Sequence, residues 1–192
     1  MNEPLIYTLT YKLTKFPMII IINGPSGVGK TQTSWELLYQ ITHTVVLDMD
    51  YIGWAFHSFD YSNESHIDYA HSTLFVLMKH HLQNGFYHFI VNGTFESSEK
   101  LNQILNVLYP LNLPIQVFCL WCNFKQLIYR VETGNSYNIN CDESISHQEV
   151  FDMMEYSSKN GYIGRMVDNT QLSIRETSDQ ILNYLRQNQM LT

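Results

Sequence analysis

The stretch from residue 18 to residue 31 constrains the fold of this chain more than any other. It opens with four consecutive isoleucines at residues 19–22, continues as G-P-S-G-V-G-K-T over residues 24–31, and then runs into a helical pattern. An unbroken run of β-branched residues is typical of a strand that is buried on both faces, as the strands of a parallel sheet are. The stretch therefore predicts a buried strand, a tight loop and a helix in direct succession.

The loop of this stretch matches the phosphate-binding loop, or P-loop, G-x-x-x-x-G-K-[ST]. Glycines let such a loop turn so tightly that its N–H groups converge on one point, next to the positive end of the following helix. Lys30 would reach the β- and γ-phosphates of a nucleoside triphosphate, and Thr31 would hold Mg²⁺ through its hydroxyl. The alternative is an ordinary glycine-rich turn after a buried strand. The predicted nucleotide-binding residues are Gly24, Pro25, Ser26, Gly27, Val28, Gly29, Lys30 and Thr31.

The length and composition fit a single soluble domain. The 192 residues suffice for one α/β domain with a full core, and 45% of them are hydrophobic. No apolar run approaches the roughly 20 residues that a membrane-spanning helix needs, and residues 1–17 lack the pattern of an export signal. The three cysteines, an odd number, imply no disulfide framework. We expect a cytoplasmic protein without membrane contact.

The charge distribution argues against a nucleic-acid partner. The net charge is −7, and Lys79, Lys100 and Lys125 are the only lysines or arginines between Thr31 and Tyr129. A nucleic-acid-binding surface needs a basic stripe, which this segment cannot supply.

Strand-like and helix-like segments alternate along the chain. Strands are expected near residues 18–22, 45–47, 86–91, 115–121 and 163–167. Helices are expected near residues 31–41, 65–83, 96–109, 127–130, 147–159 and 173–187. This order predicts an α/β three-layer sandwich, a parallel five-stranded sheet with helices on both faces. Residues 18–192 would form this domain, and residues 1–17 an N-terminal extension or an added edge strand.

Several polar segments directly follow predicted strands: the P-loop and residues 48–50, 92–95 and 168–170. Ligands of parallel sheets bind beyond the carboxyl ends of the strands, so one cleft should collect these segments. Two longer polar connections would border it. We expect an acceptor-binding loop at about residues 50–65 and a mobile lid at about residues 132–146.

With these pieces in place, the chain resembles the small P-loop kinases, the nucleoside/nucleotide kinase-like fold of the P-loop NTPases. Adenylate, shikimate and gluconate kinases and chloramphenicol phosphotransferase share this fold. The resemblance covers about residues 18–188 and implies ATP as the phosphoryl donor. Residues 24–31 match the ATP phosphate loop, and residues 48–52 match the D-x-D-hydrophobic segment that opens the acceptor site. Arg130 matches the first lid arginine, and residues 168–170 match the loop that packs against adenine, which adds Asn169 and Thr170 to the nucleotide-binding set.

The chain departs from the family pattern at two positions. The family commonly has a second lid arginine, whereas residues 131–148 contain neither lysine nor arginine; Arg165 is a candidate substitute. Asn92 stands where many P-loop proteins carry an aspartate that holds the Mg²⁺ water shell. That task would fall to Asp48.

These matches suggest a role for each polar residue of the cleft. Asp50 is the candidate general base for an acceptor hydroxyl, and Arg130 would neutralise the transferring phosphoryl group. Each has a structural alternative: a carboxylate that caps the next segment, or a surface arginine of a helix. The candidate acceptor-binding residues are Asp50, Trp54, Phe56, His57 and Asn92. The aromatic ones would equally fit a small satellite core.

The sequence therefore predicts an ATP- and Mg²⁺-dependent kinase that phosphorylates a hydroxyl of a small molecule, as a monomer or homodimer. Residues 50–99 contain no arginine and a single lysine, Lys79, against six carboxylates, so we expect a neutral or cationic acceptor such as a nucleoside, a sugar or an aminated antibiotic. The alternative is a catalytically weak ATP-binding module that switches a partner interaction.

Overall fold

The computed structural model describes residues 17–54, 58–60, 62–133 and 147–191. Residues 1–16 of the predicted N-terminal extension, Phe56 and His57, and residues 134–146 of the predicted lid lie outside the described residues. The described ranges contain every predicted strand of the domain.

Within these ranges the strands form one parallel five-stranded sheet in the order β2-β3-β1-β4-β5. The strands are β1 (Met18–Asn23), β2 (Thr44–Asp48), β3 (His88–Asn92), β4 (Ile115–Trp121) and β5 (Arg165–Asp168). β1 pairs with β3 on one side and with β4 on the other, so the isoleucine run lies at the centre of the sheet. The predicted parallel sheet is confirmed.

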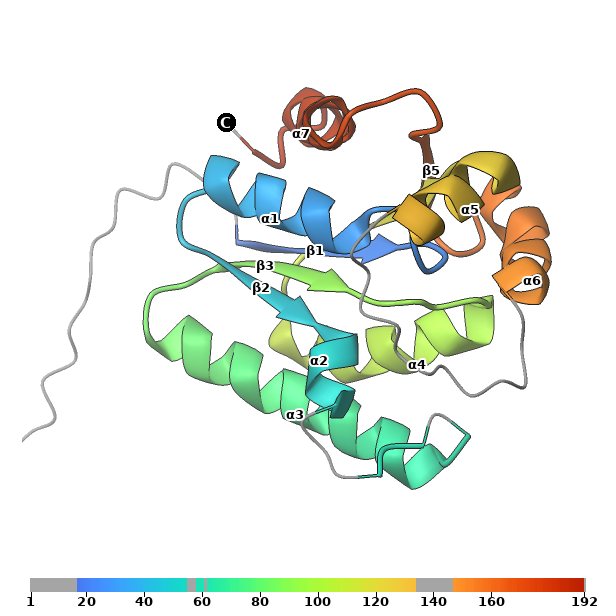
Figure 1. Cartoon of the computed structure of the whole chain (residues 1–192). Coiled ribbons are helices and arrows are strands. Elements are labelled where there is room, and N and C mark those ends of the chain that lie inside the picture. Colours follow the sequence, from blue (N-terminus) through green and yellow to red (C-terminus); the bar gives the residue numbers. More distant parts are fainter. Residues whose placement is uncertain (1–16, 55–57, 61, 134–146, 192) are drawn as a thin grey trace, which may run out of the picture.

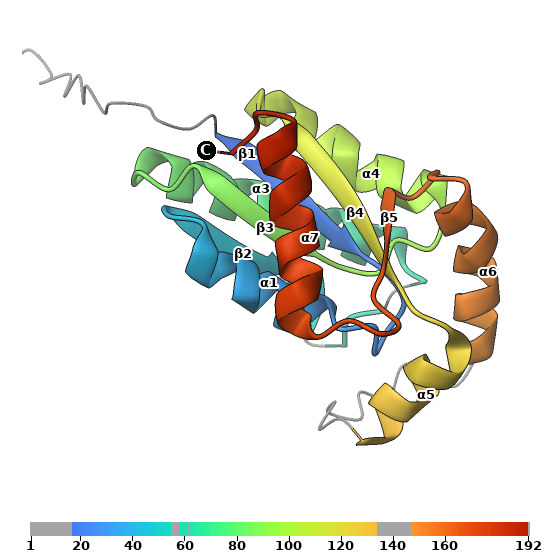
Figure 2. The same ribbon diagram turned by 90° about the horizontal axis from the view of Figure 1, so that it is seen from above.

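Helices cover both faces of the sheet (Figures 1 and 2). α1 and α7 pack together on one face, α3 and α4 pack together on the other, and α5 and α6 lie toward the carboxyl ends of the strands. The helices are α1 (Lys30–Gln40), α2 (Met49–Trp54), α3 (Glu64–Gln83), α4 (Ser98–Leu108), α5 (Phe124–Thr133), α6 (His147–Lys159) and α7 (Ile174–Gln187), with a 3₁₀ turn at Tyr109–Leu111. None of the described helices is long and apolar enough to cross a bilayer.

The isoleucine run forms the middle of the hydrophobic core. Ile19, Ile20, Ile21 and Ile22 have no exposed surface, because helices cover the central strand on both sides. Fully burying such a side chain contributes about 2 kcal/mol, so this short run is a large part of the driving force for folding. The partners that surround the sheet include Leu37 of α1, Leu74 of α3, Ile104 of α4 and Ile181 of α7, all fully buried.

Helix α2 was not expected, since the sequence predicts an acceptor-binding loop at about residues 50–65. Asp48 Oδ1 accepts a hydrogen bond from the backbone N–H of Asp50 at 2.9 Å, at the start of the helix. Six residues are too few to display helical periodicity, so the pattern could not reveal this element. Asp50 consequently lies in the first turn of a helix.

The cysteines of the described ranges are buried thiols. Cys119 and Cys122 have no exposed surface and are not bonded to each other. Burial raises the pKa of the Cys119 thiol to about 12. Since the thiolate is the reactive form, Cys119 is inert at neutral pH.

The side chain of Asn23, at the end of β1, joins three segments that are distant in the sequence. Its Nδ2 group donates to the carbonyl of Phe95 at 2.9 Å and to that of Ile163 at 3.1 Å. Its Oδ1 atom accepts from the N–H groups of Gly24 and Phe95, each at 2.8 Å. The residue is fully buried, so every one of these bonds forms away from water. Asn23 therefore holds the start of the P-loop against the segment after β3 and the segment before β5.

We predict that Asn23→Ala lowers the free energy of unfolding by about 3 kcal/mol or more, because it leaves several buried backbone groups without partners, each at a cost of about 1–3 kcal/mol. Asn84→Ala is the matched control, since Asn84 is exposed and donates one bond to the His80 carbonyl. Its expected loss is below about 1 kcal/mol. Chemical denaturation measures both, and equal losses would contradict the assigned role of Asn23.

Candidate nucleotide and acceptor site

The P-loop turns through backbone angles that favour glycine. The φ angles of Gly24, Gly27 and Gly29 are +145°, +84° and +102°. A Cβ atom on Gly24 would lie 2.6 Å from the backbone oxygen of Leu120, and one on Gly27 would overlap Val131 Cγ2. Both the conformation and the space therefore require glycine at these two positions.

The ammonium group of Lys30 lies inside the loop. Its Nζ atom donates to the carbonyls of Gly24 at 2.9 Å and Pro25 at 3.2 Å, and to Thr94 Oγ1 at 3.0 Å. The residue is 9% exposed, which is low for a lysine. A buried cation held by neutral oxygens within the P-loop is well placed to bind phosphate.

Thr31 and Asp48 come together as the sequence predicts. Thr31 Oγ1 donates to Asp48 Oδ2 at 3.3 Å. Burial raises the pKa of Asp48, and the negative charge of Asp50 raises it further, although hydrogen bonds from the backbone and the charge of Lys30 act in the opposite direction. A half-buried carboxylate whose charged form is disfavoured in this way would be stabilised by a cation. Mg²⁺ at nucleotide sites is usually bound by one or two protein groups, and phosphate and water supply the other ligands. Thr31 and Asp48 fit such a site.

Arg130 and Asn169 hold the P-loop from its other side. The carbonyl of Val28 accepts hydrogen bonds from Arg130 Nη1 at 3.1 Å and from Asn169 Nδ2 at 3.0 Å. Arg130 also donates to the side-chain and backbone oxygens of Asn169, at 2.9 and 2.8 Å. Thr170 Oγ1 accepts from the N–H of Asn123, just before α5. Arg130 and Asn169 thus meet at the P-loop, where Arg130 connects the P-loop to the loop of Asn169, whereas Thr170 contacts the start of α5.

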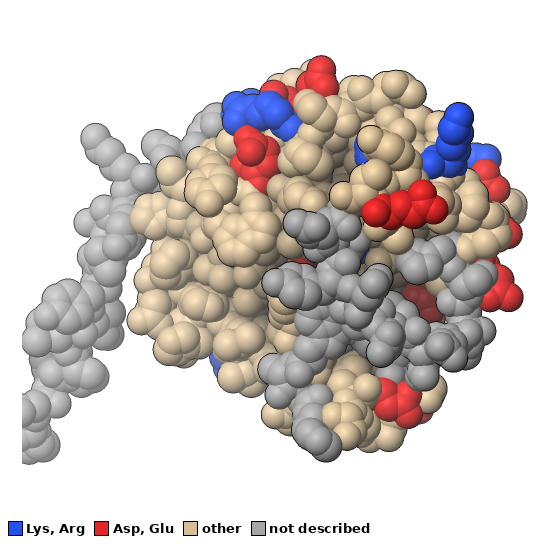
Figure 3. All heavy atoms as spheres, in the orientation of Figure 1, with Lys and Arg blue, Asp and Glu red and all other residues tan. Residues whose placement is uncertain are grey.

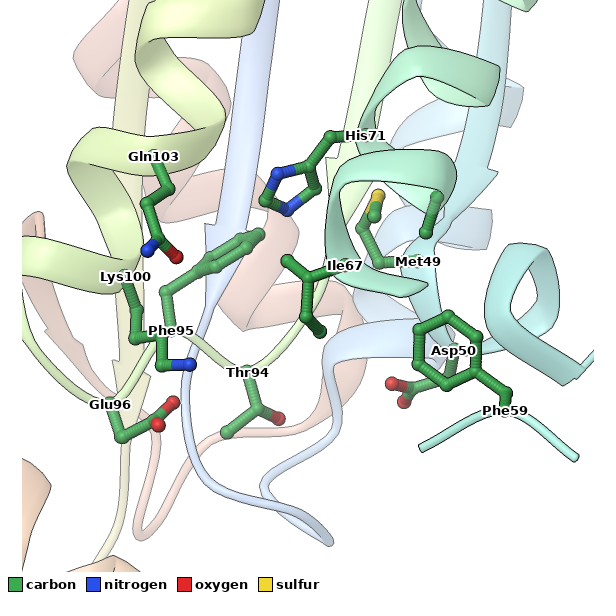
Figure 4. A pocket seen from close by; sticks show the side chains of 11 residues that line it. Met49, Asp50, Phe59, Ile67, His71, Thr94, Phe95, Glu96, Lys100 and Gln103 are labelled. Carbon is green, nitrogen blue, oxygen red and sulfur yellow. The ribbon is translucent and has the colours of Figure 1, made fainter. Parts of the chain in front are cut away.

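A hollow of about 610 Å³, counting the part open to solvent, lies beside the P-loop between α2, α3, α4 and the segment after β3 (Figure 4). We call it the α3–α4 pocket. Asp50, one of the candidate acceptor-binding residues, lies in its wall. The lining residues are Met49, Asp50, Phe59, Ile67, Ala70, His71, Thr94, Phe95, Glu96, Lys100 and Gln103.

Of the other predicted acceptor residues, Asn92 is the one whose side chain the structure describes, and it does not line this pocket. The Asn92 side chain is buried and donates to Ser34 Oγ at 3.2 Å, on the α1 side of the sheet. Phe56, His57 and the side chain of Trp54 lie outside the described residues. Arg165, considered as a second lid arginine, instead stacks over the ring of Tyr184 at 4.2 Å.

Sequence reasoning missed His71 and Lys100 as pocket residues. A signal for His71 exists, because it lies on the same stripe of α3 as Ile67 and Leu74, at helical spacing. Lys100 lies one residue beyond the acidic segment 50–99, and the structure puts it in the pocket wall. Lys79, the single lysine of that segment, is exposed and lies over the ring of Phe75.

The pocket is nevertheless more acidic than basic. Among the described residues that line it, Asp50 and Glu96 face a single lysine, Lys100. A neighbouring hollow shares Lys100 and adds the carboxylates of Glu64 and Asp68. On the face shown in Figure 3, the described lysines and arginines are few and form no continuous area.

The P-loop geometry and the sheet order 2-3-1-4-5 define the class of this protein as a P-loop NTPase with the nucleotide kinase-like fold. Residues 19–133, more than half of the chain, match the AAA domain family, and the chain belongs to this family of P-loop proteins. No curated protein matches the sequence.

Solved structures, small kinases among them, share the fold. The tunicamycin resistance protein of Deinococcus radiodurans is 16% identical, with a TM-score of 0.67 over 91% of this chain and 97% of its own. A gluconokinase from Sinorhizobium meliloti 1021 is 11% identical, with a TM-score of 0.60 over 91% and 95%. Shikimate kinase from Acinetobacter baumannii, in complex with shikimate, is 17% identical, with a TM-score of 0.60 over 91% and 96%. These likenesses show the fold that the sequence predicts.

We predict that Gly27→Ala weakens nucleotide binding at least tenfold and destabilises the protein more than Gly85→Ala does. The two glycines have nearly equal φ angles, +84° and +86°, so both substitutions carry the same backbone strain of about 1–2 kcal/mol. A Cβ on Gly85 meets no atom within 4 Å, whereas one on Gly27 would push Val131, and with it the helix that carries Arg130. Denaturation and calorimetric titration with a non-hydrolysable ATP analogue measure the two effects. Equal affinity in the two variants would contradict the close packing of the P-loop against α5.

Proposed function

We propose that this protein is an ATP-dependent phosphotransferase that moves the γ-phosphoryl group to a hydroxyl of a small neutral or cationic molecule. One observation carries the proposal. Thr94 lines the α3–α4 pocket and also accepts a hydrogen bond from the P-loop lysine, Lys30, at 3.0 Å. The place where a γ-phosphate would lie therefore adjoins the α3–α4 pocket.

In the proposed reaction, the acceptor hydroxyl lies near Asp50 and Thr94. Asp50 takes the hydroxyl proton while the acceptor oxygen forms a bond to the γ-phosphorus, and the bond from that phosphorus to the bridging oxygen of ADP breaks. Lys30 and the P-loop N–H groups stabilise the phosphate charge throughout. Mg²⁺, brought with ATP and held by Thr31 and Asp48, would supply further neutralisation of that charge.

The charge of the pocket supports a neutral or cationic acceptor. Asp50 and Glu96 outnumber Lys100 in the pocket wall, and Glu64 and Asp68 stand next to it. An anionic acceptor would meet several like charges at partly desolvated distances, each at a cost on the order of a kcal/mol. Arg130 offers no compensation in this arrangement, since its guanidinium is bonded to Val28 and Asn169.

The second candidate function is a nucleotide-operated switch of a partner interaction. The observation that favours it is the engagement of Arg130, which bonds to the P-loop and to Asn169, away from the residues that line the pocket. ATP turnover with and without a panel of hydroxyl-bearing acceptors separates the two functions. An enzyme forms a phosphorylated acceptor, whereas a switch binds ATP without transferring its γ-phosphoryl group to an acceptor.

Lys30→Ala should abolish detectable ATP binding and turnover, because the phosphates lose the one ammonium group held inside the loop. The control is Lys79→Ala, which removes an exposed lysine of α3 and should leave both unchanged. Calorimetry and an ADP-release assay measure the outcome. Normal nucleotide affinity in Lys30→Ala would refute the assignment of the P-loop.

Asp50→Asn should lower phosphoryl transfer by roughly 10²–10⁴ while ATP affinity stays within a few fold, because a general base of this kind contributes that factor to the rate. Asp179→Asn, which alters an exposed carboxylate of α7, is the matched control. Single-turnover assays with an active acceptor measure the transfer step itself. If Asp50→Asn transfers phosphate at the wild-type rate, another group accepts the proton.

A further inference from the structure

His71 is a polar side chain in the apolar part of the α3–α4 pocket. It projects from α3, is 6% exposed, and shares the pocket wall with Ile67, Ala70 and Phe95. Figure 4 shows its ring directed into the hollow, close to the Phe95 ring and Ile67, while Asp50 and Thr94 lie toward the opposite end.

The ring of His71 has hydrogen-bonding capacity that the protein does not use. Within the described ranges, neither of its nitrogens has a hydrogen-bond partner. The only described side-chain atom that is both unpartnered and sealed from solvent is Thr33 Oγ1. The His71 nitrogens therefore reach the space of the pocket. Nitrogens that face the pocket and have no partner among the described residues are placed to donate to and accept from a molecule bound there.

The ring is neutral at physiological pH. Burial lowers the pKa of His71, the charge of Lys100 lowers it further, and Asp68 opposes both. A neutral imidazole carries one N–H donor and one nitrogen acceptor. Gln103 of α4, exposed at the rim of the same pocket, adds a carboxamide that also donates and accepts.

The position of His71 and Gln103 in the pocket assigns them to the part of the acceptor that does not react. The hydroxyl must lie at the end with Thr94 and Asp50, next to Lys30. His71 and Gln103 would meet the remote part of the same molecule. The walls between the two ends include the apolar side chains of Phe95, Ile67, Met49 and Phe59, which suit the flat face of a ring.

We propose that His71 is a specificity-determining residue, and that the acceptor is a hydroxyl-bearing molecule whose planar ring carries an amide or imide group; this rests on the proposed phosphotransferase function. Such a group has a carbonyl that accepts and an N–H that donates, so His71 and Gln103 pair with both. A sugar without that ring has hydroxyls on every side, and the apolar walls would leave several of them unpaired. A purely apolar ring would leave His71 unpaired. Sites built in this way reject unmatched analogues by large factors.

Matched ligands test the proposal. Uridine and thymidine carry an imide ring on a hydroxyl-bearing sugar, and methyl β-ribofuranoside carries a comparable sugar without the ring. We expect wild-type kcat/KM for the better nucleoside to exceed that for the riboside by at least tenfold.

His71→Phe, which keeps the size of the ring and removes its nitrogens, should raise KM for the nucleoside at least tenfold without a comparable change for the riboside. His71→Gln restores a donor and an acceptor and should recover part of that loss. His80→Phe, an exposed histidine of the same helix, is the control for substitution on α3.

The outcomes separate the two proposals. Equal kcat/KM for nucleoside and riboside, or an equal loss for both in His71→Phe, overturns the role of His71 and leaves the phosphotransferase standing. ATP binding without phosphorylation of any hydroxyl-bearing compound overturns the phosphotransferase. In that case calorimetry of uridine with the ATP-analogue complex still decides the ligand class, since failure of the nucleosides to bind overturns it. Denaturation of each variant confirms that a loss of binding is not a loss of folding.

Discussion

The four hydrogen bonds of the buried Asn23 side chain are the interaction on which the rest of the proposed active centre depends. They join the start of the P-loop to the segment that carries Thr94 and Phe95, and to the loop that leads into β5. The first connection positions the nucleotide side of the site against the acceptor side. Buried backbone groups without partners cost free energy. The Asn23 side chain therefore favours the loop conformations in which these groups are bonded to it.

The P-loop is held at both of its ends by such contacts. Asn23 holds the beginning, and the Val28 carbonyl accepts from Arg130 and Asn169 near the other end. Lys30 lies between them, with its charge directed toward carbonyl and hydroxyl oxygens. A loop fixed in this way has its N–H groups preorganised, so that little reorganisation is needed when a phosphate enters. Burial also raises the pKa of the Asp48 carboxyl, and a bound cation would stabilise its charged form.

The fold and the nucleotide half of the site could be predicted because their signals are local. Lys30, Thr31 and the glycines of residues 24–31 are neighbours in the sequence, and the loop conformation follows from their residue types. Asp48 could be paired with Thr31 because parallel strands bring their carboxyl ends to one edge of the sheet. The helix at Asp50 and the pocket position of Lys100 could not be predicted, since the first element is too short to be periodic and the second depends on how α4 packs against α3.

The sequence by itself determined a parallel α/β sheet, a phosphate-binding loop and the carboxylates at the end of β2 and just after it, because strand burial, glycine conformation and strand polarity are properties of short stretches. Only the tertiary structure decided which side chains share the acceptor pocket. His71 and Gln103 share this pocket although they are on different helices. Asn92 ends β3, which is the strand next to β2, but its side chain points to the α1 side of the sheet. Which way a side chain of a strand faces, and which helices meet over it, depends on the packing of the whole chain, and no short stretch contains that information.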